Sequence, residues 1–89
     1  MDIGTKNNER EYCLVILYHK SVNEDCIMGI LHAWDEKYLV RSRQEIQHSI
    51  KLTVDLHLKT VQPEVIQYLS SLDGVERVLL VAESSLNVA

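Results

Sequence analysis

Glycine, proline and cysteine are scarce in this chain. Its 89 residues contain three glycines, one proline, two cysteines and no phenylalanine. The glycines are far apart, at Gly4, Gly29 and Gly74, so the sequence holds no phosphate loop and no dinucleotide fingerprint. Two cysteines do not make a disulfide framework. Cys13 and Cys26 lie in apolar stretches, and we expect both to be buried free thiols in a reducing compartment.

Long hydrophobic runs and an excess of positive charge are also missing. No stretch reaches the roughly 18 apolar residues of a membrane span, and the first ten residues lack the apolar core of a signal peptide. A net charge of −4 argues against a general nucleic-acid surface. We interpret residues 1–10 as a disordered lead-in or linker, residues 11–84 as one domain, and residues 85–89 as a frayed tail.

What is present is a clear order of secondary-structure elements. Apolar periodicity predicts, in turn, a strand at 12–18, a helix at 22–35, an edge strand at 38–46, an alternating strand at 52–58, a helix beginning at Pro63 and a strand at 75–82. This β-α-β-β-α-β order is that of the split βαβ domains. We therefore predict a ferredoxin-like α+β sandwich. Its four-stranded antiparallel sheet should have the strand order 4-1-3-2, with both helices on one face.

Local signals predict where the helices and turns lie. Ser21 and Glu24 have the spacing of a capping box, which predicts the start of the first helix. Gly29 inside that helix indicates a close approach to the sheet. Gly74 is placed to take the left-handed conformation that closes the second helix. The turn at 47–50 lacks glycine and Asn-Gly, so we do not expect a two-residue primed turn there.

The first strand is apolar on both faces, whereas two helices can cover only one face of the sheet. One apolar row is therefore expected on the open face, as the interface of a symmetric homodimer: Cys13, Val15, Leu17, Leu79 and Val81. Burying about 300 Å² of such surface is worth roughly 7 kcal/mol before association costs. The alternative is a monomer in which Arg41 and Arg43, on one face of the edge strand, lie over this patch.

Few residues have the pattern of a chemical site. Antiparallel pairing of the first and third strands is expected to bring Cys13, Asp55 and His57 to the open face, which makes them weak candidates for a transition-metal site. We favour solvated or interface residues instead, and expect neither metal nor cofactor. A reactive thiol needs a positive or helix-terminal setting, which the centre of a strand does not offer. We therefore expect no catalytic residue and no enzymatic activity.

Two sequence features resemble a known family. They are the alternating run Ile50-Lys51-Leu52-Thr53-Val54-Asp55-Leu56 and the motif Leu69-Ser70-Ser71-Leu72-Asp73-Gly74-Val75-Glu76-Arg77-Val78. The chain from Tyr12 to Ala82 resembles an ACT-like domain, most closely the cytosolic C-terminal domain of MgtC/SapB-type membrane proteins.

This resemblance implies a non-catalytic regulatory or dimerisation domain of a membrane protein linked to magnesium homeostasis. The domain would lie on the cytoplasmic side, with the parent membrane domain in cis, and the isolated fragment would be soluble. The first strand-to-helix turn lacks the glycine of amino-acid-sensing ACT domains, so we do not expect a small-molecule ligand.

A second resemblance keeps an alternative open. The segment Val54-Asp55-Leu56-His57-Leu58 is similar to a strand in the cytosolic domain of cation-diffusion-facilitator transporters. That resemblance implies a metal-binding domain with His57 as a ligand. A ligand-sensing ACT domain is the other alternative.

Overall fold

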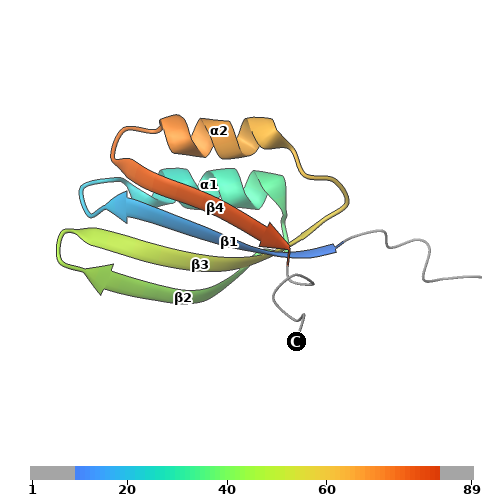
Figure 1. Cartoon of the computed structure of the whole chain (residues 1–89), viewed down its shortest axis with the longest axis horizontal. Helices are drawn as coiled ribbons and strands as arrows, with labels where there is room; N and C mark the ends of the chain where they lie inside the picture. The colour runs from blue at the N-terminus through green and yellow to red at the C-terminus, as the bar shows by residue number, and fades with distance from the viewer. Residues whose placement is uncertain (1–9, 83–89) are drawn as a thin grey trace, which may run out of the picture.

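The computed structural model describes residues 10–82 and contains two helices and four strands (Figure 1). In chain order these are β1 (Arg10–His19), α1 (Glu24–Trp34), β2 (Leu39–Ile46), β3 (Ser49–Leu58), α2 (Pro63–Ser71) and β4 (Val75–Ala82). The proposed lead-in 1–10 and tail 85–89 lie outside the described residues, except for Arg10, where β1 begins.

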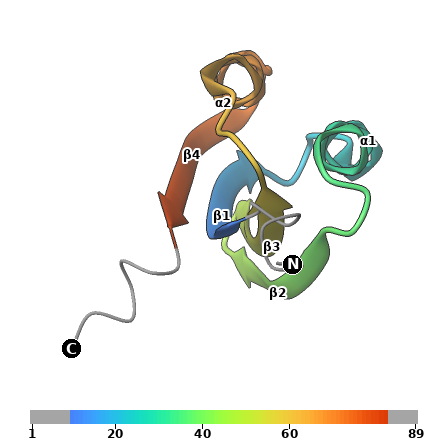
Figure 2. The ribbon, with the colours of Figure 1, turned by 90° about the vertical axis from the view of Figure 1, so that its right-hand side faces the viewer.

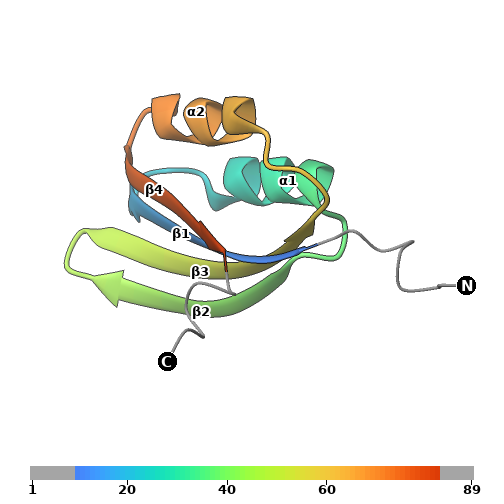
Figure 3. The ribbon, with the colours of Figure 1, turned by 45° about the vertical axis from the view of Figure 1, so that its right-hand side comes forward.

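The strands form one antiparallel sheet in the order β2-β3-β1-β4. Both helices lie on the same side of this sheet, and the described residues leave its other side uncovered (Figures 2 and 3). The predicted α+β ferredoxin-like fold and its strand order are confirmed.

The core lies between the sheet and the helices. Side chains of opposed residues in an antiparallel pair share a face, and the register opposes Leu14 to Val54 and Ile16 to Leu52. Alternation along β1 and β3 therefore turns one row of each strand toward the helices. The buried core cluster is Leu14, Ile16, Tyr18, Ile27, Leu31, Ile50, Leu52, Val54, Leu56, Leu58 and Leu69.

The first helix begins two residues after the predicted position. Asn23 is its N-cap, because its backbone is extended and its Oδ1 accepts a 3.0 Å hydrogen bond from the Asp25 amide. Ser21 instead lies in the preceding turn, where its amide donates to His19 Nδ1. The capping-box prediction was therefore wrong: Glu24 does not reach back to a capping serine but contacts Tyr18.

The helix glycine and the turn glycine behave differently. Gly29 lies on the exposed side of α1, and a Cβ added there would meet nothing within 4 Å, so the expected close approach to the sheet was wrong. Gly74 has a φ of +94°, and a Cβ there would overlap the Val22 side chain. The left-handed conformation predicted for Gly74 is confirmed.

The hairpin between β2 and β3 has a two-residue turn, contrary to the sequence expectation. Ile46 pairs with Ser49, and Gln47 between them has a φ of 55°. Contacts with the end of β1 hold the turn, since the His48 carbonyl accepts a 2.8 Å hydrogen bond from the Lys20 amide. Tertiary contacts thus keep a non-glycine residue in the left-handed region.

Strand β2 contains an irregularity that changes the faces of its charged residues. Its register with β3 shifts between Val40 and Ser42. An extra residue in one strand reverses the alternation beyond it. Arg41 reaches Asp55, whereas Arg43 reaches Glu24 at the start of α1. The expectation that Arg41 and Arg43 share one face was therefore wrong.

Candidate functional site

The uncovered face of the sheet carries an apolar strip along β1 and β4. The register opposes Cys13 to Val81 and Val15 to Leu79, and Leu17 continues the row on β1. Cys13 is buried, Leu79 is 50% exposed, and the other three are partly exposed. The structure thus brings the five residues of the predicted interface together on one face. That they form a dimer interface stays a prediction.

Two further apolar residues lie on the uncovered face and were missed from the sequence. Leu39 is opposite Asp55 and Ile46 is opposite Ser49, so both share the face of these β3 residues. They are 62% and 47% exposed. Both were missed because the register shift within β2 leaves no signal in the hydrophobic pattern.

Charged residues flank the apolar strip at both of its ends. Lys51 and Arg77 are the neighbours of Leu17 on β3 and β4. Asp55 is opposite Cys13, and Glu11 follows one row further along β1. The Leu17 end therefore carries two cationic side chains together with the Glu76 carboxylate, which accepts a hydrogen bond from Ser49. The Cys13 end carries two carboxylates, and Arg41 is paired with one of them, Asp55.

The candidate metal ligands share this face but do not converge. Cys13 is opposite Asp55, whereas His57 is opposite Glu11. Asp55 Oδ2 lies 3.3 Å from Arg41 Nε, and His57 Nε2 lies 3.6 Å from Glu11 Oε2. Glu11, Arg41, Asp55 and His57 line a pocket of about 180 Å³. Within residues 10–82, no group of three or more His, Cys, Asp or Glu side chains is arranged to hold a metal. Asp55, one of the candidate ligands, is already ion-paired with the Arg41 guanidinium.

The two cysteines differ in exposure. Cys13 is buried, as expected, but Cys26 is exposed on α1, so the expectation of two buried thiols was wrong for Cys26. Both remain free of disulfides. The helix turns Ile27, not Cys26, toward the sheet.

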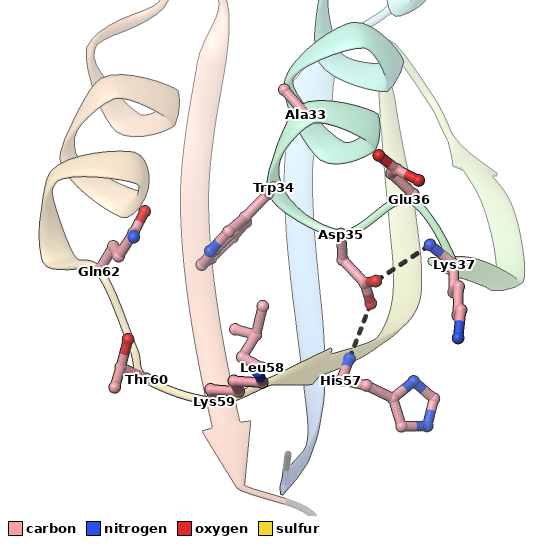
Figure 4. A pocket seen from close by; sticks show the side chains of 10 residues that line it. All are labelled: Ala33, Trp34, Asp35, Glu36, Lys37, His57, Leu58, Lys59, Thr60 and Gln62. Carbon is pink, nitrogen blue, oxygen red and sulfur yellow. Dashed lines mark hydrogen bonds between the residues drawn. The ribbon is translucent and has the colours of Figure 1, made fainter. Parts of the chain in front are cut away.

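A pocket of about 420 Å³ lies at the C-terminal end of α1 (Figure 4). Asp35, the C-cap of α1, accepts hydrogen bonds from the backbone amides of His57 at 2.8 Å and Lys37 at 3.0 Å. Asp35 thereby provides an acceptor for a backbone amide of β3 that lies beyond the pairing with β2. Trp34 also lines this pocket, and its buried Nε1 has no hydrogen-bond partner among the described residues. The remaining lining is mostly charged or polar, unlike the apolar lining of a typical ligand site.

A buried tyrosine joins three elements on the helix side. The Tyr18 hydroxyl donates a 2.7 Å hydrogen bond to Glu24 Oε2, and Arg43 Nε donates to the same oxygen at 2.9 Å. Burial, reinforced by the hydrogen bond to Glu24, raises the pKa of Tyr18 well above its ordinary value. The hydrogen bond from Tyr18, together with Arg43, lowers the pKa of Glu24. This cluster ties β1 to α1 and β2, and its role is structural.

These features define a class: a small ferredoxin-like α+β domain with an uncovered, partly apolar sheet face. No family model matches the chain, and no curated protein matches it. Among solved structures, the chain is similar to one described as the solution structure of the C-terminal domain of the MgtC protein from Mycobacterium tuberculosis. The similarity covers 92% of each chain with a TM-score of 0.64 and 18% sequence identity. The predicted resemblance is therefore confirmed in the fold.

One further finding bears on location. Neither helix between residues 10 and 82 is long and apolar enough to cross a membrane.

Proposed function

We propose that the chain is a non-catalytic regulatory or dimerisation domain. It would form the cytosolic C-terminal part of an MgtC/SapB-type membrane protein linked to magnesium homeostasis. The fold similarity to the MgtC C-terminal domain over 92% of both chains supports the family. The observation that carries the functional proposal is the apolar strip on a sheet face that no described element covers.

The size of this face sets the expected strength of association. Four strands of about eight residues, at roughly 4.8 Å spacing and 3.3 Å rise, present on the order of 500 Å² in projection. A standard stable interface buries about 800 Å² on each partner. We therefore expect a weak homodimer, with a dissociation constant in the micromolar range. Such a domain would add to the assembly of a larger protein rather than drive it alone.

Sedimentation of charge-substituted variants tests the dimer. Leu79 is half exposed on an edge strand, so Leu79→Asp should fold while placing a carboxylate in the strip. We expect the wild type to dimerise at tens of micromolar and Leu79→Asp to stay monomeric. Val61→Asp is the matched control, because Val61 is exposed but lies outside the sheet. A wild type that is monomeric at its highest soluble concentration would contradict the proposal.

The link to a membrane protein and to magnesium needs separate tests. Membrane spans encoded upstream of Met1 in the complete gene would support a parent membrane domain, and their absence would contradict it. Deleting that gene should impair growth in magnesium-poor medium, and magnesium should restore growth. Equal growth of the deletion strain and its parent in that medium would count against the magnesium link.

The metal-binding alternative makes a different prediction. It requires the side chains near His57 to bind a divalent ion despite the Arg41 guanidinium beside Asp55. Calorimetric titration with zinc discriminates between the two: no binding tighter than about micromolar, or roughly −8 kcal/mol, excludes a metal-binding function.

A further inference from the structure

We propose that the second copy lies on the uncovered face with its strands antiparallel to those of the first, so that Lys51 of each copy faces Asp55 of the other. The two-fold axis would lie in the plane of the interface and cross the strands at Thr53, Val15 and Leu79. This arrangement rests on the proposed dimer and specifies its geometry.

The strand register places the relevant residues in three parallel rows across β3, β1 and β4. The central row is Thr53, Val15 and Leu79. The row on one side is Lys51, Leu17 and Arg77, and the row on the other side is Asp55, Cys13 and Val81. These three strands lie side by side in Figure 3. Lys51 and Asp55 are thus equally far from the central row, on the same strand and with opposite charge.

A two-fold rotation about the central row exchanges its two flanking rows. Lys51 of one copy then lies over Asp55 of the second copy, and symmetry forms the pair twice. Leu17 packs over Cys13, and Val15 and Leu79 pack on their own counterparts, while Arg77 lies over Val81 of the other copy. Facing sheets pack within about 30° of each other, so these rows stay approximately matched.

The other two-fold arrangement of this strip is electrostatically unfavourable. An axis parallel to the strands, between β1 and β4, would keep the Leu17 ends of both copies together. Leu17 would then lie over Arg77, and the Lys51 and Arg77 side chains of both copies would gather at one end. Like charges brought together at one end of an interface are unfavourable. The distribution of charge therefore favours the antiparallel arrangement.

Asp55 is only partly accessible to a second copy. Its side chain is 19% exposed, and Oδ2 is paired with Arg41 at 3.3 Å. The other oxygen, Oδ1, is buried without a hydrogen-bond partner among residues 10–82. A carboxylate oxygen left in this state is costly. Lys51 of a second copy cannot reach this covered oxygen and would instead approach the exposed part of the Asp55 side chain.

Charge reversal followed by mixing tests this geometry. Lys51→Glu and Asp55→Lys should each weaken the homodimer at least tenfold, because each variant faces like charges across both symmetric pairs. An equimolar mixture of the two variants should form a heterodimer with nearly wild-type affinity, because both pairs then have opposite charges. Lys59→Glu is the control, since Lys59 is exposed beyond the end of β3. Sedimentation equilibrium measures all five dissociation constants, those of the wild type, the three variants and the heterodimer.

The outcomes separate this arrangement from the proposed dimer itself. A monomeric wild type overturns both. A dimeric wild type with unchanged affinity in Lys51→Glu, or no heterodimer in the mixture, overturns only the arrangement. Where Asp55→Lys fails to fold, Lys51→Glu/Asp55→Asn replaces it. That double variant should dimerise more tightly than Lys51→Glu alone, and equal or weaker dimerisation overturns the arrangement.

Discussion

Replacing Glu24 by alanine should destabilise the domain by about 2 kcal/mol, although Glu24 lies near the surface as the first residue of α1. The largest contribution comes from Tyr18, which is fully buried and donates its hydroxyl to Glu24 at 2.7 Å. A buried donor left without an acceptor costs about 1–3 kcal/mol. The lost ion pair with Arg43 adds little, because the Arg43 side chain is 42% exposed and water screens it. Removing a carboxylate from the first helical turn costs about 0.3–1 kcal/mol more.

Urea denaturation followed by circular dichroism measures this free energy, and three companion variants divide it into parts. Asp25→Ala removes the neighbouring first-turn carboxylate, which is exposed, and should cost less than about 1 kcal/mol. Tyr18→Phe removes the donor together with the bond, and should cost about 1 kcal/mol. The double variant Tyr18→Phe/Glu24→Ala should then cost less than the sum of its parts, because no buried hydroxyl is left unpaired.

Two results would refute this reasoning. One is a Glu24→Ala variant no less stable than Asp25→Ala, which would mean that Glu24 acts only through the helix terminus. The other is strict additivity in the double variant, which would mean that Tyr18 and Glu24 do not interact in solution. In a domain of this size each kcal/mol shifts the melting temperature by about 4–8 °C, so thermal melts provide an independent check.

The remaining predictions concern pH and three backbone positions. The folded-state pKa of Glu24 is lowered. The stability difference between wild type and Glu24→Gln should therefore be fully present above about pH 4.5 and shrink as the pH falls through the folded pKa. Urea titrations across this pH range measure the difference. Gly29→Ala should raise the free energy of unfolding by about 1 kcal/mol, since an added Cβ has open space in the helix, and a destabilised variant would contradict this. Gly74→Ala should lower it by about 3 kcal/mol, through the positive φ and the overlap with Val22, and a neutral thermal melt would contradict this. Gln47→Gly should stabilise the hairpin by about 0.5–1 kcal/mol, because glycine takes its φ of 55° without strain; an unchanged denaturation midpoint would argue against this.

The charged and polar contacts could not be predicted from the sequence, and Arg41 and Arg43 show why. Two residues apart on a regular strand, they should share a face. The irregularity at Val40 and Ser42 separates them, so that one contacts Asp55 and the other Glu24. An irregularity of this kind depends on how two strands pair, and neither strand's own pattern contains it.

The candidate interface was predictable for a different reason. Val15 and Leu17 are apolar on a strand whose other row, Leu14 and Ile16, already fills the core. Because the two helices can cover only one face of the sheet, the other apolar row lies on the uncovered face. The order of residues within that face, with Lys51 near one end and the Asp55 carboxylate near the other, became visible only when the register was known.

The sequence by itself determined the elements and their order, because period-two and helical apolar patterns are local and β-α-β-β-α-β has few compact solutions. It also determined the start of α2 at Pro63 and the left-handed Gly74, where one residue type suits one backbone conformation. Only the tertiary structure decided the Gln47 turn and the contact of Glu24 with Tyr18. Both depend on segments far apart in the chain, whose contacts outweigh the local preferences of the residues involved.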